Sequence, residues 1–211
     1  MAQSKVKVGF TPVDFEVFTI ADFSERMRQI YGLVRPKLLK LGDDLAPELA
    51  RKLGMEFFPH VARHARRTVN PPPETWAAFG PSPRGYKRYG YLALCISGIG
   101  LHARCVVKAE ADNRSFMAQN LRSRAAQLVD DFNGTRLAHY DRWNFVELPV
   151  GQPVDQKRLT TTLAENLTKK TGGLDLGFGW NLKEALRLDR AELLDAFREL
   201  EPLYRTLREA A

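Results

Sequence analysis

The sequence predicts an α+β fold in a single domain, residues 1–211, with a mainly antiparallel sheet flanked by helices. Three observations support this prediction. Apolar residues recur at helical spacing in the first quarter of the chain, short apolar runs broken by Gly and Pro fill residues 57–107, and helical spacing returns after residue 113. The sequence has no internal repeat, low-complexity tract or linker that would divide it.

The composition excludes several classes of protein. Of the 211 residues, 44% are hydrophobic and 27% are charged, which rules out a disordered chain, a collagen, a disulfide-rich scaffold and a polytopic membrane protein. The longest apolar stretch, residues 89–107, contains a histidine and an arginine, so we expect no membrane span. Residues 1–9 lack the apolar region of a secretory signal. We therefore expect a cytoplasmic protein.

The first elements are predicted to be helices with identifiable ends. Thr11 and Pro12 suit a helix start, and a longer helix begins after Asp22. Pro36 cannot donate to the helix hydrogen bonds, so this helix should kink or restart near residue 35. A further apolar stripe over residues 45–53 predicts another helix, which Gly54 ends.

The middle of the chain predicts strands. These are Phe57–Thr68, Thr75–Phe79, Tyr89–Ser97 and Leu101–Ala109. Glycines at 98 and 100 indicate a hairpin between the last two strands. Cys95 and Cys105 lie on these strands and are the only cysteines. We expect two free, buried thiols in a reducing compartment, with a disulfide between neighbouring strands as the alternative.

The C-terminal half mixes helices with short strands. The predicted elements are, in order, a helix capped by Asn113, a strand at Phe145–Leu148, a helix capped by Asp155, a strand at Leu174–Trp180 and a C-terminal helix that begins at Asp189 and kinks at Pro202. Helices before, beside and after an antiparallel sheet complete the α+β pattern.

The positive charge is concentrated in one segment. The chain has 32 Lys and Arg against 25 Asp and Glu, a net charge of +7. Residues 60–88 contain six basic residues and one acid, Glu74, and so hold +5 of that total. The basic residues are Arg63, Arg66, Arg67, Arg84, Lys87 and Arg88. Aromatic residues alternate with them, which suits the binding of phosphate, carboxylate or nucleic acid.

This segment supports one structural interpretation and three functional hypotheses. The structural interpretation is a solvated sheet face whose arginines pair with acids. The first function is a binding site for an anionic small molecule, with ligand-binding candidates Arg66, Arg67, Asn70, Trp76, Arg84, Tyr86 and Lys87. The second is an enzyme in which His60, His64 or Glu74 transfers a proton while arginines stabilise an anion. The third is nucleic-acid binding.

The spacing of the two histidines bears on a metal site. On a helix His60 and His64 would lie ~6 Å apart and could share a metal. On a strand they would share a face, with Ala62 and Arg66, but lie ~13 Å apart. Because Pro59 and the aromatic and β-branched ends of this segment favour a strand, and no third ligand follows, we predict neither metal nor cofactor. Glu74 could instead pair with an arginine.

One string resembles a known family. The sequence from His60 to Pro72, HVARHARRTVNPP, followed by Thr75-Trp76 and by RGYK at 84–87, resembles the signature of YktB-like bacterial proteins, domain of unknown function 1054. The resemblance implies an α+β cytosolic protein and no particular reaction. The family pattern has a Pro-His pair after the RGYK element, in the place where this chain reads Tyr-Gly-Tyr-Leu at 89–92, so a site that used that histidine would be incomplete here. The small size suits a monomer or a dimer.

Overall fold

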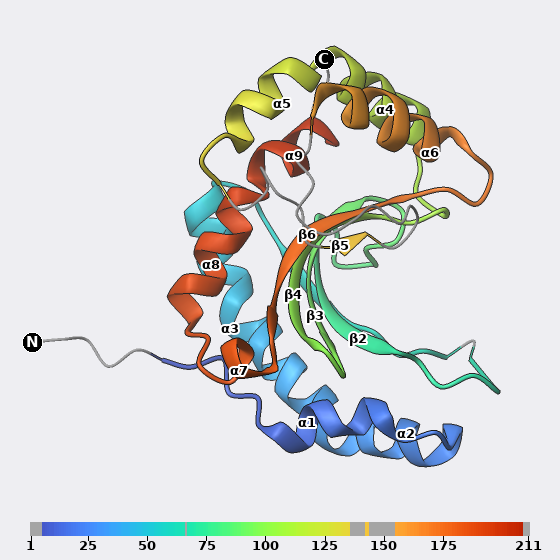
Figure 1. Cartoon of the computed structure of the whole chain (residues 1–211), viewed down its shortest axis with the longest axis vertical. Coiled ribbons are helices and arrows are strands. Elements are labelled where there is room, and N and C mark those ends of the chain that lie inside the picture. Colours follow the sequence, from blue (N-terminus) through green and yellow to red (C-terminus); the bar gives the residue numbers. More distant parts are fainter. Residues whose placement is uncertain (1–5, 66, 136–141, 144–154, 209–211) are drawn as a thin grey trace, which may run out of the picture.

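The computed structural model describes residues 6–65, 67–135, 142–143 and 155–208. Within these ranges an antiparallel sheet has the strand order β1-β2-β3-β4-β6-β5 (Figure 1). The strands are β1 (Phe58–Val61), β2 (Glu74–Gly80), β3 (Gly90–Ser97), β4 (Gly100–Val107), β5 (Arg142–Trp143) and β6 (Leu174–Asn181). The predicted α+β class with a mainly antiparallel sheet is confirmed.

Helices precede and follow the sheet. They are α1 (Pro12–Glu16), α2 (Phe23–Gln29), α3 (Arg35–Leu53), α4 (Arg114–Ser123), α5 (Ala125–Phe132), α6 (Ala164–Thr168), α7 (Leu182–Ala185), α8 (Arg190–Glu199) and α9 (Glu201–Thr206). A 3₁₀ turn spans Val17–Thr19, and wider π-helical turns span Ile30–Val34 and Arg158–Leu163. None of the helices in the described ranges has the length and apolar character needed to cross a membrane.

The N-terminal helices follow their predicted ends. The amide of Thr11 donates to Asp14 at 2.7 Å, and the carboxylate of Asp22 accepts from the amide of residue 25. The helix restarts after a π turn, with α3 beginning at Arg35 and ending at Leu53, and Gly54 caps it with φ of +64°. The predicted boundary at residue 35 is confirmed, but residues 45–53 continue α3 rather than forming a separate helix.

The sheet has two faces of different character. The helix face carries the main core, in which Phe79 packs edge-to-face on Phe197 of α8 at 5.6 Å. The helices α3 and α9 also contact strands of the sheet. The second face carries a smaller apolar cluster, made of Ala78, Tyr86, Tyr91, Ala93, Cys95 and Val106. Side chains alternate between these faces along each strand.

This alternation decides the state of the cysteines. Cys95 pairs with His102 and belongs to the second face, whereas Cys105 pairs with Leu92 and lies in the main core. Both are free and buried. The prediction of two free thiols is confirmed, and the alternative of a disulfide is wrong because the two side chains point to opposite faces.

The first predicted strand is too long. The strand β1 ends at Val61, after which the amide of Ala62 still donates to the carbonyl of Trp76 at 3.0 Å. The backbone then turns, since His64 has φ of +49° and its carbonyl accepts from the amide of Arg67. The prediction that His60, Ala62, His64 and Arg66 share one face of a strand is therefore wrong for His64, and Arg66 lies outside the described residues.

The C-terminal elements agree with most of the predicted ends. Asp155 accepts from the amide of Arg158, and Asp189 accepts from the amide of Glu192, as expected of helix caps. Asn113 precedes α4 but makes no side-chain capping bond. A new helix, α9, begins with Pro202 in its first turn. The predicted strand at Phe145–Leu148 lies outside the described residues.

Candidate functional site

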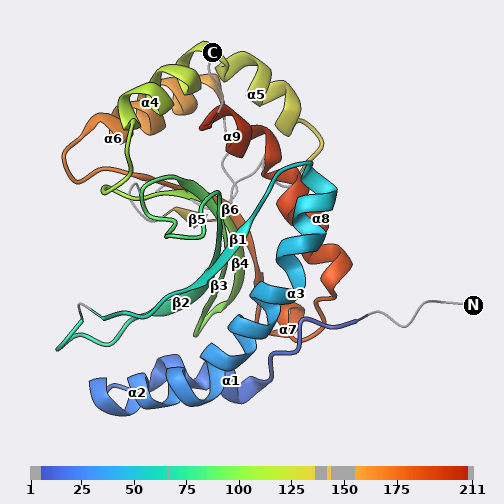
Figure 2. The ribbon, with the colours of Figure 1, turned by 180° about the vertical axis from the view of Figure 1, so that it is seen from behind.

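A pocket of about 1220 Å³ opens beside β1, the first strand of the sheet. Its lining comes from α3, from β1 and the following residues up to Arg67, from Trp76 of β2, and from the β2–β3 loop at 82–89. Seen from behind, α3 passes next to β1 (Figure 2). Most of the segment that holds the excess positive charge therefore folds around one cavity.

The β2–β3 loop is held against the second face by close packing. Gly80 ends β2, and a Cβ at this position would lie 2.8 Å from Cβ of Tyr86 and 3.3 Å from its Cα. The missing side chain lets Tyr86 fold back over the sheet, where its hydroxyl accepts from Nε1 of Trp76 at 3.1 Å. Burial raises the pKa of Tyr86, so its hydroxyl stays protonated at neutral pH.

His60 connects the loop to the edge strand. Its Nε2 lies 2.8 Å from the carbonyl oxygen of Ser82, and its ring centroid lies 5.5 Å from that of Tyr86. Since a carbonyl can only accept, Nε2 must carry the proton in this contact. His60 therefore keeps the loop in place while remaining part of the pocket lining.

His64 is held in an unusual backbone conformation by its side-chain contacts. Its Nε2 lies 3.0 Å from Oγ1 of Thr75, and its ring packs edge-to-face with Trp76 at 5.4 Å. Burial lowers the pKa of His64 to about 4; the positive charges of Arg67 and Lys87 also lower it, and Glu74 acts in the opposite direction. The imidazole is therefore neutral at neutral pH.

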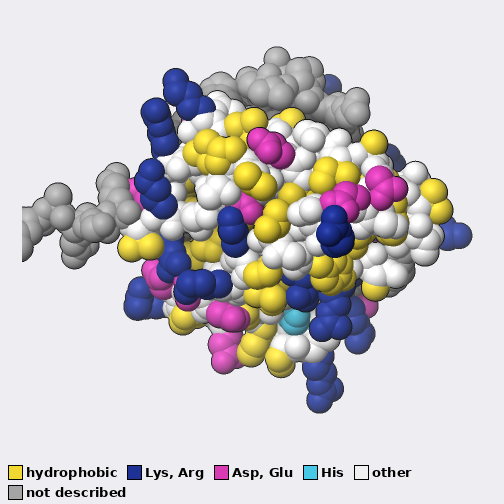
Figure 3. Space-filling model, turned by 90° about the horizontal axis from the view of Figure 1, so that it is seen from below, with side chains coloured by type: hydrophobic (Ala, Val, Ile, Leu, Met, Phe, Trp, Pro, Cys, Tyr) yellow, Lys and Arg dark blue, Asp and Glu magenta, His cyan; other side chains and the backbone are white. Residues whose placement is uncertain are grey.

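Most of the basic residues around the pocket have no acidic partner. The basic residues of its lining are Arg35, Arg63, Arg67, Arg84, Lys87 and Arg88, and its described lining contains no Asp or Glu. Figure 3 shows Lys and Arg side chains gathered beside a histidine on the face seen from below. Arg88 pairs with Asp112 at 2.7 Å, and Lys87 lies 3.9 Å from Glu110. The other four arginines have no acid within 4.0 Å among the described residues.

The structure brings seven of the ten candidate residues to this pocket. They are His60, His64, Arg67, Trp76, Arg84, Tyr86 and Lys87. Asn70 is exposed outside the lining, and its carbonyl accepts from Arg67 at 3.3 Å. Arg66 lies outside the described residues. Arg35 is an additional lining residue that no sequence pattern indicated; it reaches the pocket because α3 packs on β1.

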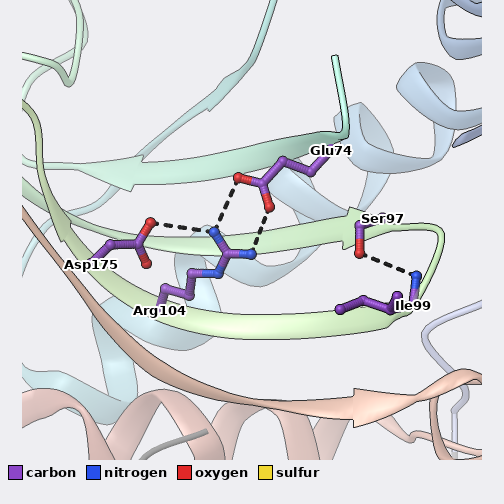
Figure 4. A network of polar contacts seen from close by, with 5 residues as sticks. All are labelled: Glu74, Ser97, Ile99, Arg104 and Asp175. Carbon is purple, nitrogen blue, oxygen red and sulfur yellow. Dashed lines mark hydrogen bonds and ion pairs between the residues drawn. The ribbon is translucent and has the colours of Figure 1, made fainter. Parts of the chain in front are cut away.

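Glu74, the remaining candidate, belongs to a buried ion network on the second face. Its two carboxylate oxygens accept from the guanidinium of Arg104 at 3.1 and 2.7 Å, and Asp175 accepts from the same group at 3.3 Å (Figure 4). Burial by itself lowers the pKa of Arg104, but Cys95 and the two carboxylates outweigh it and raise the pKa. Glu74 therefore pairs with an arginine, the alternative weighed from the sequence.

Comparison with known proteins places the chain among bacterial relatives. The family model described as domain of unknown function DUF1054 matches residues 10–204. The chain belongs to this family. A UPF0637 protein of Bacillus velezensis is 32% identical over 206 residues, which cover 94% of this chain and 96% of the relative. The resemblance of the HVARHARRTVNPP string is thereby confirmed.

Two further relatives match over shorter stretches. A UPF0637 protein of Lysinibacillus sphaericus is 43% identical over 129 residues, 60% of this chain and 61% of the relative, so this alignment covers less than two thirds of its length. A UPF0637 protein of Bacillus licheniformis is 52% identical over 85 residues, 40% of each chain. Neither the family description nor these names assign an activity, so any function must be argued from the pocket.

Proposed function

We propose that this protein binds a small anionic ligand, with a phosphate or carboxylate group, in the pocket beside β1. The observation that carries the proposal is the set of four arginines, at 35, 63, 67 and 84, that line the pocket without an acid partner in the described chain. An arginine fork binds phosphate or carboxylate through two parallel hydrogen bonds. The pocket thus supplies the donors that such a ligand needs.

The solvated-face interpretation accounts for only part of the cluster. Arg88 and Lys87 have acids nearby, as that interpretation requires. By contrast, Arg63 and Arg84 are exposed next to the cavity and make no side-chain hydrogen bond to the described residues. Positive charges held together without neighbouring acids repel one another, and a bound anion would relieve this repulsion.

An enzyme with a histidine acid or base is the second candidate. It requires both histidines beside the arginines, and His60 and His64 do line the same pocket. However, a general base works best with a pKa near the operating pH, and that of His64 is about 4. Its neutral ring is better suited to hydrogen bonding, so the pocket supports binding more strongly than proton transfer.

Thermal shift and calorimetry can test the binding proposal directly. We expect inorganic phosphate, small phosphate esters or carboxylates to raise the melting temperature, and Arg63→Gln or Arg84→Gln to reduce that rise. Arg122→Gln is the matched control, because Arg122 is exposed on α4 away from the pocket. A flat response to every anion would refute the proposal.

The same assay separates nucleic acid from small anions. Binding to nucleic acid should fall steeply with added salt as counterions are released. If a short single-stranded RNA binds tightly and small anions do not, the third hypothesis replaces the first.

A cytoplasmic location and a monomeric or dimeric state are likewise part of this proposal.

A further inference from the structure

The hydrogen-bond partners of the pocket histidines fix which ring nitrogen holds the proton. In neutral His60, Nε2 donates to the carbonyl of Ser82, so Nδ1 is an acceptor. This Nδ1 has no hydrogen bond to the part of the chain that the structure describes. His60 therefore adds an unoccupied acceptor beside the basic donors of the lining.

His64 has the opposite tautomer. Thr75 is 1% exposed, and among the described residues the only hydrogen-bond partner of its hydroxyl is Nε2 of His64. A buried hydroxyl proton needs an acceptor, so the hydroxyl donates to Nε2 and the imidazole proton resides on Nδ1. Nδ1–H is then a neutral donor.

Tyr86 adds a further donor. Its oxygen accepts from Nε1–H of Trp76, an indole group that can only donate. The phenolic proton of Tyr86 therefore points elsewhere, and no described residue accepts it. The pocket lining thus combines two neutral donors and one neutral acceptor with the unpaired arginines.

The aromatic rings themselves are largely occupied. The ring of Trp76 has the ammonium of Lys108 at 5.5 Å and the edge of His64 at 5.4 Å. The ring of Tyr86 packs between His60, at 5.5 Å, and Tyr91, at 4.7 Å. These contacts leave little ring surface for stacking a flat heterocycle, so the uncharged part of the ligand is recognised through polar contacts.

We propose that the ligand is a phosphate ester that carries free hydroxyl groups, as a sugar phosphate does. A hydroxyl group both donates and accepts, so neighbouring hydroxyls can serve His60, His64 and Tyr86 together. The arginines hold the phosphate, which makes this inference dependent on the proposed anion site. The inference specifies the chemistry of the uncharged part of the ligand, which the cluster of arginines does not determine.

A panel of esters tests the inference separately from anion binding. Calorimetry would compare glucose 6-phosphate, ribose 5-phosphate and glycerol 3-phosphate with phenyl phosphate and inorganic phosphate. We expect at least one hydroxylated ester to bind about tenfold tighter than phenyl phosphate, because polar groups left unpaired in a site disfavour the apolar analogue. Gluconate, which has hydroxyls and a carboxylate, should bind more weakly than the best sugar phosphate.

Variants of His64 test the assigned donor. The amide nitrogen of Asn can replace Nδ1–H, and Asn tolerates the positive φ, so His64→Asn should keep sugar-phosphate affinity within about threefold. His64→Gln places its amide nearer to Thr75 and should lose about tenfold. In His64→Gln inorganic phosphate should lose less affinity than the sugar phosphate, whereas Arg84→Gln should weaken both ligands. The ¹⁵N shifts of His64 report the tautomer in the unmodified protein.

Each outcome has a distinct meaning. If no phosphate compound binds, the proposed function is wrong. If phenyl phosphate binds as tightly as the sugar phosphates, or the ¹⁵N shifts place the proton on Nε2, the anion site stands and the hydroxyl inference is overturned. If gluconate binds more tightly than every sugar phosphate, the phosphate ester is overturned and the anionic group is a carboxylate. A single-stranded RNA that binds a hundredfold more tightly would assign the pocket to nucleic acid and overturn the small-ligand inference.

Discussion

Arginines in two parts of the same sheet have opposite surroundings. Arg104, on β4, is 1% exposed and lies between the carboxylates of Glu74 and Asp175. Arg63 and Arg84 lie at the edge of the sheet, exposed and without acids nearby. A buried guanidinium must have its counter-charges within the protein. An exposed guanidinium is stabilised by water and is therefore available to bind an anionic ligand. Arginine content alone therefore does not identify a binding site; the distribution of the acids does.

The largest expected effect is the loss of the buried network. Arg104→Met would remove the guanidinium that the carboxylates of Glu74 and Asp175 share, and we expect the free energy of unfolding to fall by about 3–5 kcal/mol. Urea denaturation followed by circular dichroism would measure the change. Arg84→Gln serves as the comparison and should leave the unfolding midpoint unaltered.

A triple variant isolates the role of charge at this site. Combining Arg104→Met with Glu74→Gln and Asp175→Asn removes the three charges that Glu74, Arg104 and Asp175 carry, and this protein should be more stable than Arg104→Met alone. If the triple variant is no more stable, the effect of Arg104 comes from packing rather than from its counter-charges.

The next effect concerns the packing that shapes the pocket. Gly80→Ala would force Tyr86 and its loop away from the sheet, with an expected loss of about 1–3 kcal/mol in the free energy of unfolding and weaker phosphate binding. Gly32→Ala is the matched control, since a Cβ there has no atom within 4 Å. In the helical segment around Gly32 the same substitution should be neutral or stabilising. Equal effects at both glycines would contradict the close-packing argument.

His64 should make stability depend on pH in a defined window. Its pKa is 6.5 in an unfolded chain and about 4 in the folded protein, so below pH 6.5 the unfolded state takes up the proton first. Above pH 6.5, His64 makes its full contribution to the free energy of unfolding. That contribution decreases as the pH falls from 6.5 towards 4 and stays constant below pH 4. The wild type should lose more stability on acidification than His64→Asn does. A difference between the two proteins that stays constant from pH 7 to pH 4 would argue against a buried, neutral imidazole.

The sheet was predictable because its signals are local. The β3–β4 hairpin follows from two apolar runs joined by Gly98 and Gly100, and the register pairs Ser97 with Gly100 as such a turn requires. The end of β1 was not predictable in this way. At His64 the positive φ is accompanied by a hydrogen bond to Thr75, eleven residues along the chain, and no local pattern encodes that contact.

The sequence located the segment that forms the site, but not the residues that other elements contribute to it. The charge count located the pocket segment, and seven of the ten named residues line the cavity. Arg35 was missed because it comes from α3, and helix packing on β1 is a tertiary event. The sequence offered the pairing of Glu74 with an arginine but did not identify Arg104 or Asp175, because Arg104 lies 30 residues from Glu74 and 71 from Asp175 and the three meet only through the strand register.

The smallest expected effect distinguishes two arginines of one loop. Arg88 and Arg84 both line the pocket, but only Arg88 has an ion pair, with the exposed Asp112. An exposed pair adds little to stability and is screened by salt, so neither Arg88→Gln nor Arg84→Gln should shift the melting temperature appreciably. Their effects on phosphate affinity should differ, because the charge of Arg88 is already balanced and that of Arg84 is not. Calorimetric titration with phosphate at low salt would measure the difference, and a greater loss for Arg88→Gln would mean that acid partners do not decide which arginines bind.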